Sequence, residues 1–129
     1  MSRDITAYLR GDAMGGKSSQ HKGRAGELEL VRLLQAHGIP AQPGKALSFG
    51  QTPDIVGIDG IHAECKRVER LNLCAALRQA AEDSQYFEDG LPVIFHRRNR
   101  EGWVCSMRLD DWLKLYGDAK NRKKSEKGG

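Results

Sequence analysis

Residues 53–66 read PDIVGIDGIHAECK, and this stretch decides how we interpret the fold. Two runs of strand-forming residues, Asp54–Ile58 and Ile61–Val68, lie on either side of Asp59-Gly60. An Asp-Gly pair between apolar runs is a strong signal for a β-hairpin. Because side chains alternate along a strand, the second run has an apolar face and a charged face. The stretch therefore predicts a hairpin at the centre of the domain.

The flanking sequence predicts helices and further strands around this hairpin. The expected helices are 23–37, 73–87 and 111–116, and the expected strands are 46–49, 93–96 and 103–107. Asn72 and Asp110 are suited to cap the second and third helices, and Gly90 to stop the second. The resulting order, αβββαββα, indicates an α/β fold with a central mixed sheet flanked by helices.

The composition is that of a single domain without disulfides. The chain has 129 residues, which suits one domain, and its three cysteines form no CxxC pair. A reducing environment is expected, and no run resembles a membrane span or a secretory signal. We therefore expect a cytoplasmic protein.

The charge is concentrated at the two ends of the chain. Residues 1–24 hold five basic and two acidic side chains, residues 119–129 hold five and one, and residues 25–118 hold 11 and 14. We expect a basic flexible arm over 1–21, a body over 22–117 and a disordered basic tail over 118–129. Basic arms suit a polyanionic partner, although solubilising tails are an alternative interpretation.

Three residues of the hairpin have the chemistry of a magnesium-dependent phosphodiesterase. Asp54 and Glu64 offer two carboxylates, and Lys66 lies two residues after Glu64 on the same face of the strand. Mg²⁺ prefers oxygen ligands, so Cys65 would contribute its backbone carbonyl and not its sulfur. The ammonium of Lys66 could stabilise the transition state or orient the attacking water. A salt-bridged outer face of a strand is the alternative interpretation.

A second carboxylate pattern supports the metal site. Helical spacing places Glu27 on the same face as the apolar residues Leu30, Val31 and Leu34. A carboxylate on a core face needs a reason, and a ligand position at the same metal site would supply one.

The hairpin has a register problem. A two-residue loop at Asp59-Gly60 would pair Asp54 with Cys65, and opposed residues share a face. Asp54 would then point away from Glu64. A slip of one residue reverses the faces, so we expect a bulge or irregular pairing between Asp54 and Ile58, for which Gly57 is suited.

These residues resemble a known family. Residues 22–31, KGRAGELELV, together with Asp54 and Glu64-Cys65-Lys66, resemble the archaeal-type Holliday junction resolvases of the PD-(D/E)xK nuclease superfamily. The stretches at 53–57, 64–69, 71–73 and 95–100 resemble bacteriophage and prophage members. The resemblance implies a restriction-endonuclease-like core, an active site of Glu27, Asp54, Glu64 and Lys66, and a homodimer that cuts a four-way DNA junction. It also implies Mg²⁺, with Mn²⁺ as a substitute, and a bacterial host cytoplasm.

Other residues are candidates for binding DNA or for supporting the site. Basic side chains near the motifs are candidate phosphate contacts: Lys22, Arg24, Arg67, Arg70, Arg97, Arg98 and Arg100. Gln79, on the helix after the motif, is a candidate supporting residue or an exposed helix residue. His62 shares the Glu64 face, where a lone histidine is more often structural. Trp112 suggests a core or dimer contact.

Three functions follow from this interpretation. The first is a Mg²⁺-dependent, structure-specific endonuclease of the junction-resolving type. The second is a PD-(D/E)xK nuclease with another DNA substrate, such as a nicking or DNA-processing enzyme. The third is a DNA-binding module that does not cut, which the complete set of Asp54, Glu64 and Lys66 disfavours.

Overall fold

The structure, a computed structural model, describes residues 13–44 and 53–128. Its elements, in chain order, are α2 (Ala13–Ala36), β1 (Gln42–Pro43), β2 (Ile55–Val56), β3 (Ile61–Arg67), α3 (Leu73–Phe87), β4 (Leu91–Arg97), β5 (Val104–Ser106) and α4 (Leu109–Gly128). The order αβββαββα and the α/β fold class are therefore confirmed.

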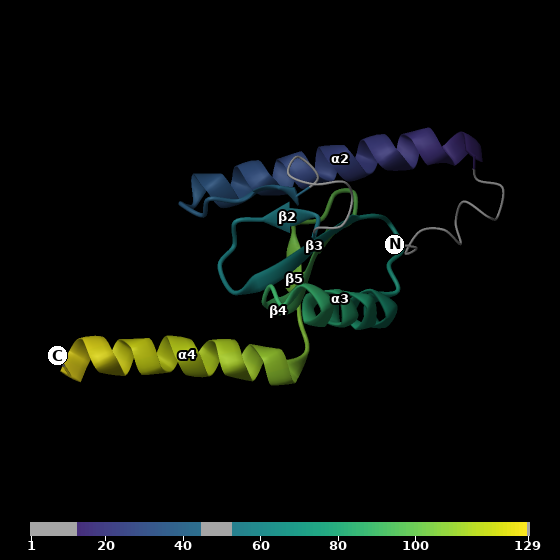
Figure 1. The fold of residues 1–129 in the computed structure, drawn as a ribbon. Helices are drawn as coiled ribbons and strands as arrows, with labels where there is room; N and C mark the ends of the chain where they lie inside the picture. Colours follow the sequence, from purple (N-terminus) through teal and green to yellow (C-terminus); the bar gives the residue numbers. More distant parts are fainter. Residues whose placement is uncertain (1–12, 45–52, 129) are drawn as a thin grey trace.

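The strands form one mixed sheet with a helix on each face (Figure 1). The strand order is β1-β2-β3-β4-β5, and only β3 and β4 are parallel, with α3 as the connection between them. α2 packs on one face through Leu30 and Val31, which meet Ala63 of β3. α3 packs on the other face, where Ala80 meets Ile94 of β4.

The register of the hairpin brings Asp54 opposite Glu64. Ile55 pairs with Ala63, which is one residue removed from the pairing that a two-residue loop would impose. Gly57 absorbs the difference with a φ of 89°, and a Cβ at this position would lie 2.1 Å from the Pro40 carbonyl oxygen. Only glycine tolerates both conditions. The predicted irregular pairing between Asp54 and Ile58 is therefore confirmed.

The region between α3 and β4 is anchored to the hairpin. The side chain of Asn72 accepts a hydrogen bond from the Ala75 amide, which confirms the predicted N-cap. α3 ends on Glu88, in the left-handed conformation at φ 51°, and not on Gly90 as expected. A Cβ on Gly90 would lie 2.4 Å from the Gly60 carbonyl, so Gly90 permits β4 to start against the hairpin loop.

The predicted bounds of the first and last helices are wrong. α2 begins at Ala13 and not at Gly23, since elongation of a nucleated helix does not require an apolar face. α4 begins at Leu109, before the expected cap at Asp110, and continues to Gly128 through the predicted disordered tail. Ala, Lys, Arg and Glu favour a helix without any amphipathic pattern.

The short strand β1 is a second departure from the sequence interpretation. The strand expected at 46–49 lies outside the described residues. β1 instead pairs Gln42 with Val56 at the edge of the sheet.

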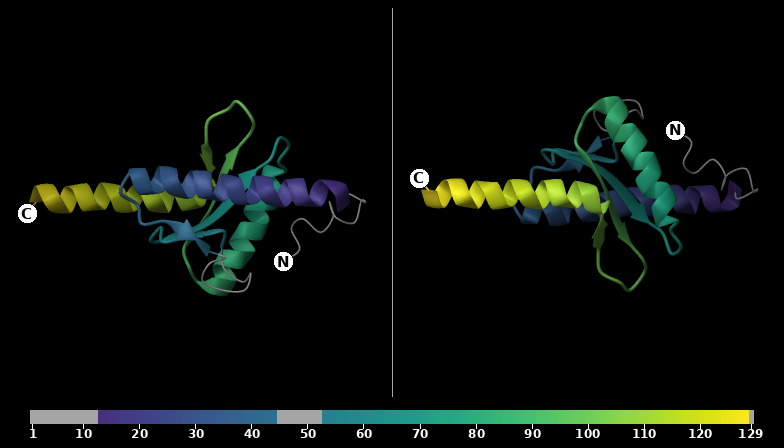
Figure 2. Two further views of the ribbon diagram at one scale, coloured as in Figure 1. Left: turned by 90° about the horizontal axis from the view of Figure 1, so that it is seen from above. Right: turned by 90° about the horizontal axis from the view of Figure 1, so that it is seen from below.

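α4 projects from the body, as two further views show (Figure 2). Its apolar residues remain exposed, and among its described side chains only that of Asp111 is buried. Within residues 13–44 and 53–128, no helix combines the length and the apolar character that crossing a bilayer requires.

Candidate active site

Asp54 and Glu64 lie next to each other at the end of the hairpin that is away from the Asp59-Gly60 loop. The amide of Asp54 lies 3.3 Å from Oε2 of Glu64, to which it donates. Oδ2 of Asp54 accepts a hydrogen bond of 3.0 Å from the Cys65 amide. The side chain of Glu64 is only 1% exposed. A buried carboxylate is costly unless hydrogen bonds, a cation or a proton compensates it, so this arrangement suits a cation.

The backbone amide of Cys65 points along the sheet toward Asp54, and its thiol points to the face of the sheet that α2 covers. The amide and carbonyl of one strand residue point to the same side, so the Cys65 carbonyl also points toward the Asp54 edge. The thiol packs against the core beneath α2. Burial raises its pKa well above the usual range, and the carboxylates of Asp54 and Glu27 raise it further. The thiolate form is therefore disfavoured, in keeping with a carbonyl ligand.

Lys66 lies on the α3 side of β3, with Glu64. Alternation places it there, since Glu64 pairs with Ile94 and Ile94 packs against α3. Lys66 is half-buried. Its ammonium is close enough to lower the pKa of Cys65, although burial and the carboxylates outweigh it. The strand thus holds a cation beside the buried carboxylate.

Glu27 is buried as expected, but on the α2 side of the sheet. It is 9% exposed, and its carboxylate acts on the pKa of Cys65. The core residues that follow it on α2, Leu30 and Val31, pack against Ala63. Its membership of the metal site therefore stays a prediction.

His62 and Asp83 lie close to the Glu64 carboxylate, and Asp89 contacts the other ring nitrogen of His62. Sequence reasoning missed both aspartates. Nε2 of His62 lies 3.4 Å from Oε2 of Glu64, and Nδ1 lies 2.8 Å from Asp89. Ligand atoms of His62, Glu64 and Asp83 all lie within 4.8 Å of one another. Nε2 of Gln79 donates to Asp83 at 3.1 Å, which places Gln79 next to this group. Only the alternation of His62 with Glu64 could have signalled the group.

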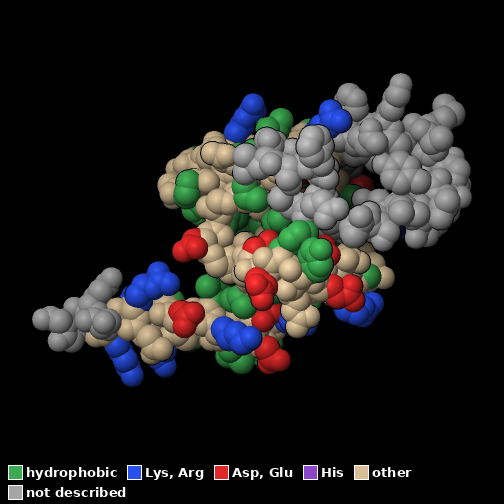
Figure 3. Space-filling model, viewed as in Figure 1, with side chains coloured by type: hydrophobic (Ala, Val, Ile, Leu, Met, Phe, Trp, Pro, Cys, Tyr) green, Lys and Arg blue, Asp and Glu red, His purple; other side chains and the backbone are tan. Residues whose placement is uncertain are grey.

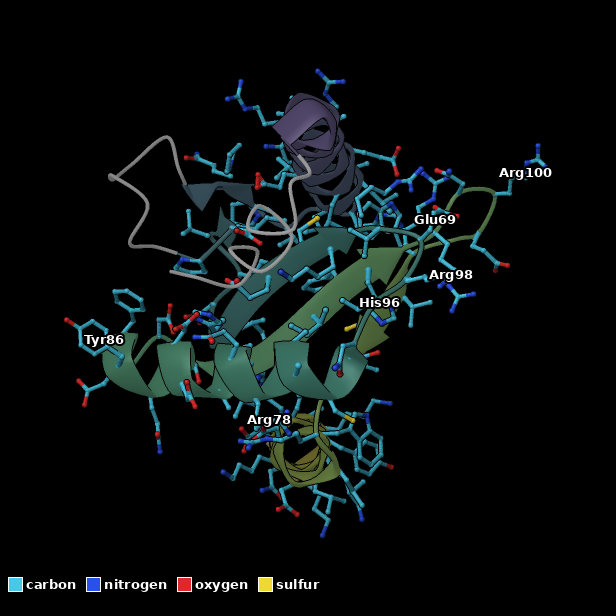
Figure 4. All side chains as sticks on the ribbon, turned by 90° about the vertical axis from the view of Figure 1, so that its right-hand side faces the viewer. Glu69, Arg78, Tyr86, His96, Arg98 and Arg100 are labelled. Carbon is cyan, nitrogen blue, oxygen red and sulfur yellow. The ribbon has the colours of Figure 1, made fainter. Side chains whose placement is uncertain are left out.

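The basic side chains that are candidates for binding DNA differ in their exposure and in whether an acidic side chain already holds them. Arg97 is held by Glu29, which also accepts from the Trp103 indole at 2.8 Å. Arg98 and Arg100 are exposed at the turn between β4 and β5 (Figure 4). Arg24 and Arg70 are also exposed.

Two other basic candidates stand apart. The side chain of Arg67 is 14% exposed and lies 3.9 Å from Glu69. Among the described residues, its Nη1 has no hydrogen-bond partner. Lys22 is in α2, and its side chain lies outside the described part of the chain.

Charge is divided between the body and α4. Figure 3 shows acidic side chains around the middle of the molecule, and Lys and Arg side chains with a few acidic ones along α4. Lys120, Arg122, Lys123 and Lys124 are all exposed. The basic end of the chain is therefore a helical surface.

Comparisons with known proteins identify a similar solved structure. No protein-family model and no curated protein matches this chain. A solved Holliday junction resolvase from Archaeoglobus fulgidus, an archaeal hyperthermophile, is similar with a TM-score of 0.49 and 22% sequence identity. The similarity covers 65% of this chain and 70% of that one.

Proposed function

We propose that this protein is a metal-dependent DNA endonuclease, specific for branched structures, that nicks two strands of a four-way junction. The observation that carries the proposal is that Asp54 lies beside the buried side chain of Glu64. The Asp54 amide nitrogen is 3.3 Å from Oε2 of Glu64. Lys66 lies on the same side of the sheet. Two carboxylates beside an ammonium suit the hydrolysis of a phosphodiester.

The donors at this point fit a hard cation. Asp54, Glu64 and the Cys65 carbonyl would hold Mg²⁺ through oxygen alone, with Glu27 contributing through a water, and Mn²⁺ would substitute. When bound, the metal lowers the pKa of a water and neutralises charge on the phosphate. The Cys65 amide, which donates to Oδ2 of Asp54, orients that carboxylate and leaves its other oxygen for the cation.

Lys66 supplies the positive charge that the transition state needs. Its half-buried position limits competition from water, so its field on a developing oxyanion is stronger than that of an exposed lysine. We assign Lys66 to stabilise the phosphorane charge and to orient the attacking water.

The exposed arginines are the proposed phosphate contacts. Arg98 and Arg100 at the β4–β5 turn, with Arg24 and Arg70, offer cations that no described partner occupies. Arg97 is a weaker candidate because Glu29 already holds it at 2.8 Å. Such contacts fix the position of DNA without reading its sequence.

We further propose that two copies act together, so that two cuts fall across one junction. α4 supports this because Leu109, Trp112, Leu113 and Tyr116 form an exposed stripe at helical spacing. Trp112 and Tyr116 stack with ring centroids 5.0 Å apart. A second copy that packs on this stripe would remove it from water.

Asp54→Asn and Glu64→Gln test the site directly. On a labelled four-way junction with Mg²⁺, we expect both variants to lose cleavage and to bind the junction as well as or better than the wild type. Each variant loses a metal ligand and a negative charge near the phosphates. Asp59→Asn and Glu82→Gln, which make the same changes at exposed positions, should cut normally.

The substrate comparison separates the competing functions. Duplex, flap and single-stranded DNA are run beside the junction, with Mg²⁺, with Ca²⁺ and without metal. Ca²⁺ should support binding without cutting because its looser shell activates water less well. Cutting of flaps in preference to junctions would indicate another nuclease class. Binding without cutting in every metal would contradict the proposal.

A further inference from the structure

His62 is a buried histidine whose two ring nitrogens have different surroundings. Its side chain is 1% exposed. Nδ1 lies 2.8 Å and 2.9 Å from the two carboxylate oxygens of Asp89. A carboxylate accepts, so Nδ1 carries a hydrogen, and in the neutral ring Nε2 keeps its lone pair. Within the described residues, Nε2 has no hydrogen-bond partner.

The lone pair of Nε2 is directed at carboxylate oxygen. Oε2 of Glu64 lies 3.4 Å away, on a side chain that is also 1% exposed. In that neutral form two acceptors face one another away from water, and the repulsion between them is only weakly screened. A cation between the two atoms would remove it.

A third donor completes the group. Asp83 of α3 places a carboxylate oxygen within 4.8 Å of both His62 and Glu64. Donors about 2.1 Å from a tetrahedral metal ion are about 3.4 Å apart, which matches the Nε2–Oε2 separation. One ion can therefore contact His62 and Glu64 without movement of either strand position.

The residues behind these donors are those that a metal site uses. A histidine ligand usually donates its second N–H to a carboxylate, which fixes the ring. Asp89 does this for His62. Gln79 does the equivalent for Asp83, to which it donates at 3.1 Å. Both partners hold a ligand that faces Glu64.

We propose that His62, Glu64 and Asp83 form a site for a divalent transition-metal ion. The imidazole nitrogen favours Zn²⁺ or Co²⁺ over Mg²⁺, which prefers oxygen alone. The site is separate from the proposed Mg²⁺ position at Asp54 but shares Glu64 with it. A bound ion ties β3 to α3 and fixes the carboxylate on which the proposed nuclease depends. The proposal itself rests on the donor geometry and does not require cleavage.

The test is metal binding by the full chain, freed of metal by a chelator. Titration calorimetry with Zn²⁺ should give one site per chain, with a much weaker response to Mg²⁺. Asp83→Asn should weaken Zn²⁺ binding by at least about tenfold, since loss of even a supporting residue costs that much. Glu82→Gln, an exposed neighbour on α3, is the matched control and should bind as the wild type does.

His62→Gln and Asp54→Asn sharpen the result. His62→Gln should weaken Zn²⁺ binding and change the visible spectrum of the Co²⁺ form, with circular dichroism to check folding. His62 is buried, so His62→Gln could fail to fold. In that case the effect of Asp83→Asn on Zn²⁺ binding decides whether the site exists. Asp54→Asn should lose cleavage and keep Zn²⁺ binding, so failure of the nuclease proposal is distinguishable from failure of this one. Zn²⁺ binding that neither Asp83→Asn nor His62→Gln weakens would overturn the site.

Discussion

α3 and α4 are both amphipathic at their start, but the fold uses them differently. α3 buries small residues, Ala76, Ala80 and Ser84, and lies flat on the sheet. α4 keeps its large apolar residues in solvent, with Leu109 67% and Leu113 51% exposed. Figure 2 shows one helix against the body and the other extended from it.

The difference separates residues that maintain the fold from apolar residues that pack on no other part of the described chain. Most of the stability of a helix in a protein comes from packing of its apolar face. α3 has that packing and holds Gln79 and Asp83 beside Glu64. α4 lacks it within the described chain, so its stripe suits an intermolecular contact.

The largest effect should come from the core under α3. Ile94 is fully buried against Ala76 and Ala80. The substitution Ile94→Ala should lower the free energy of unfolding by about 2–5 kcal/mol. Leu113→Ala on α4 should cost less than about 0.5 kcal/mol in dilute solution, as at other exposed positions. Urea denaturation of the two variants measures this contrast. Equal losses would mean that α4 is part of the core.

The next effect concerns self-association. Trp112→Ala should weaken a dimer by about tenfold or more, because exposed aromatic residues of this kind dominate interfaces. Sedimentation velocity over a range of concentrations measures the shift. Asp118→Ala, on the opposite side of α4, is the control and should not change it. A wild-type chain that is monomeric throughout would refute the role given to the stripe.

A smaller effect is expected from the basic end of α4. Removal of residues 119–129 deletes five basic side chains. Affinity should fall by a similar factor for junction and duplex DNA. The dependence of log K on log salt should flatten by about one unit for each phosphate that these side chains neutralise. A weakening confined to the junction would indicate that this segment recognises the branch.

The smallest effect is a pH dependence at the strand pair that leads into α4. Burial, followed by the charge of Arg98, lowers the pKa of His96 below its usual 6.5. The folded chain therefore binds this proton less readily than the unfolded chain. Neutral His96 therefore favours the folded state. This contribution to stability is fully present above pH 6.5, the usual pKa of histidine, and is lost as the pH falls through the lower pKa of the folded chain.

Thermal unfolding across this pH range should show the effect. The wild-type midpoint should fall with decreasing pH more steeply than that of His96→Gln, by a modest amount because His96 is only partly buried. Parallel curves for the two proteins would contradict it.

Local signals explain what sequence reasoning predicted correctly. The alternation in β3, the Asn72 cap and the αβββαββα order all depend on residues close together in the chain. The lengths of α2 and α4 were missed because their outer halves lack an apolar stripe. The convergence of Asp83 and Asp89 on His62 was missed because no fixed spacing links a helix and its end to a strand.

The sequence by itself singled out the candidate residues for the chemistry, Asp54, Glu64 and Lys66, on a hairpin ahead of a helix. Only the tertiary structure decided that Asp54 lies beside Glu64. A regular two-residue loop would have separated them, and the slip that unites them depends on Gly57 lying against the Pro40 carbonyl. That contact joins the hairpin to a segment that lies well before it in the chain. Strand register is therefore a property of the packed molecule, because a change of one residue reverses every side chain of the strand.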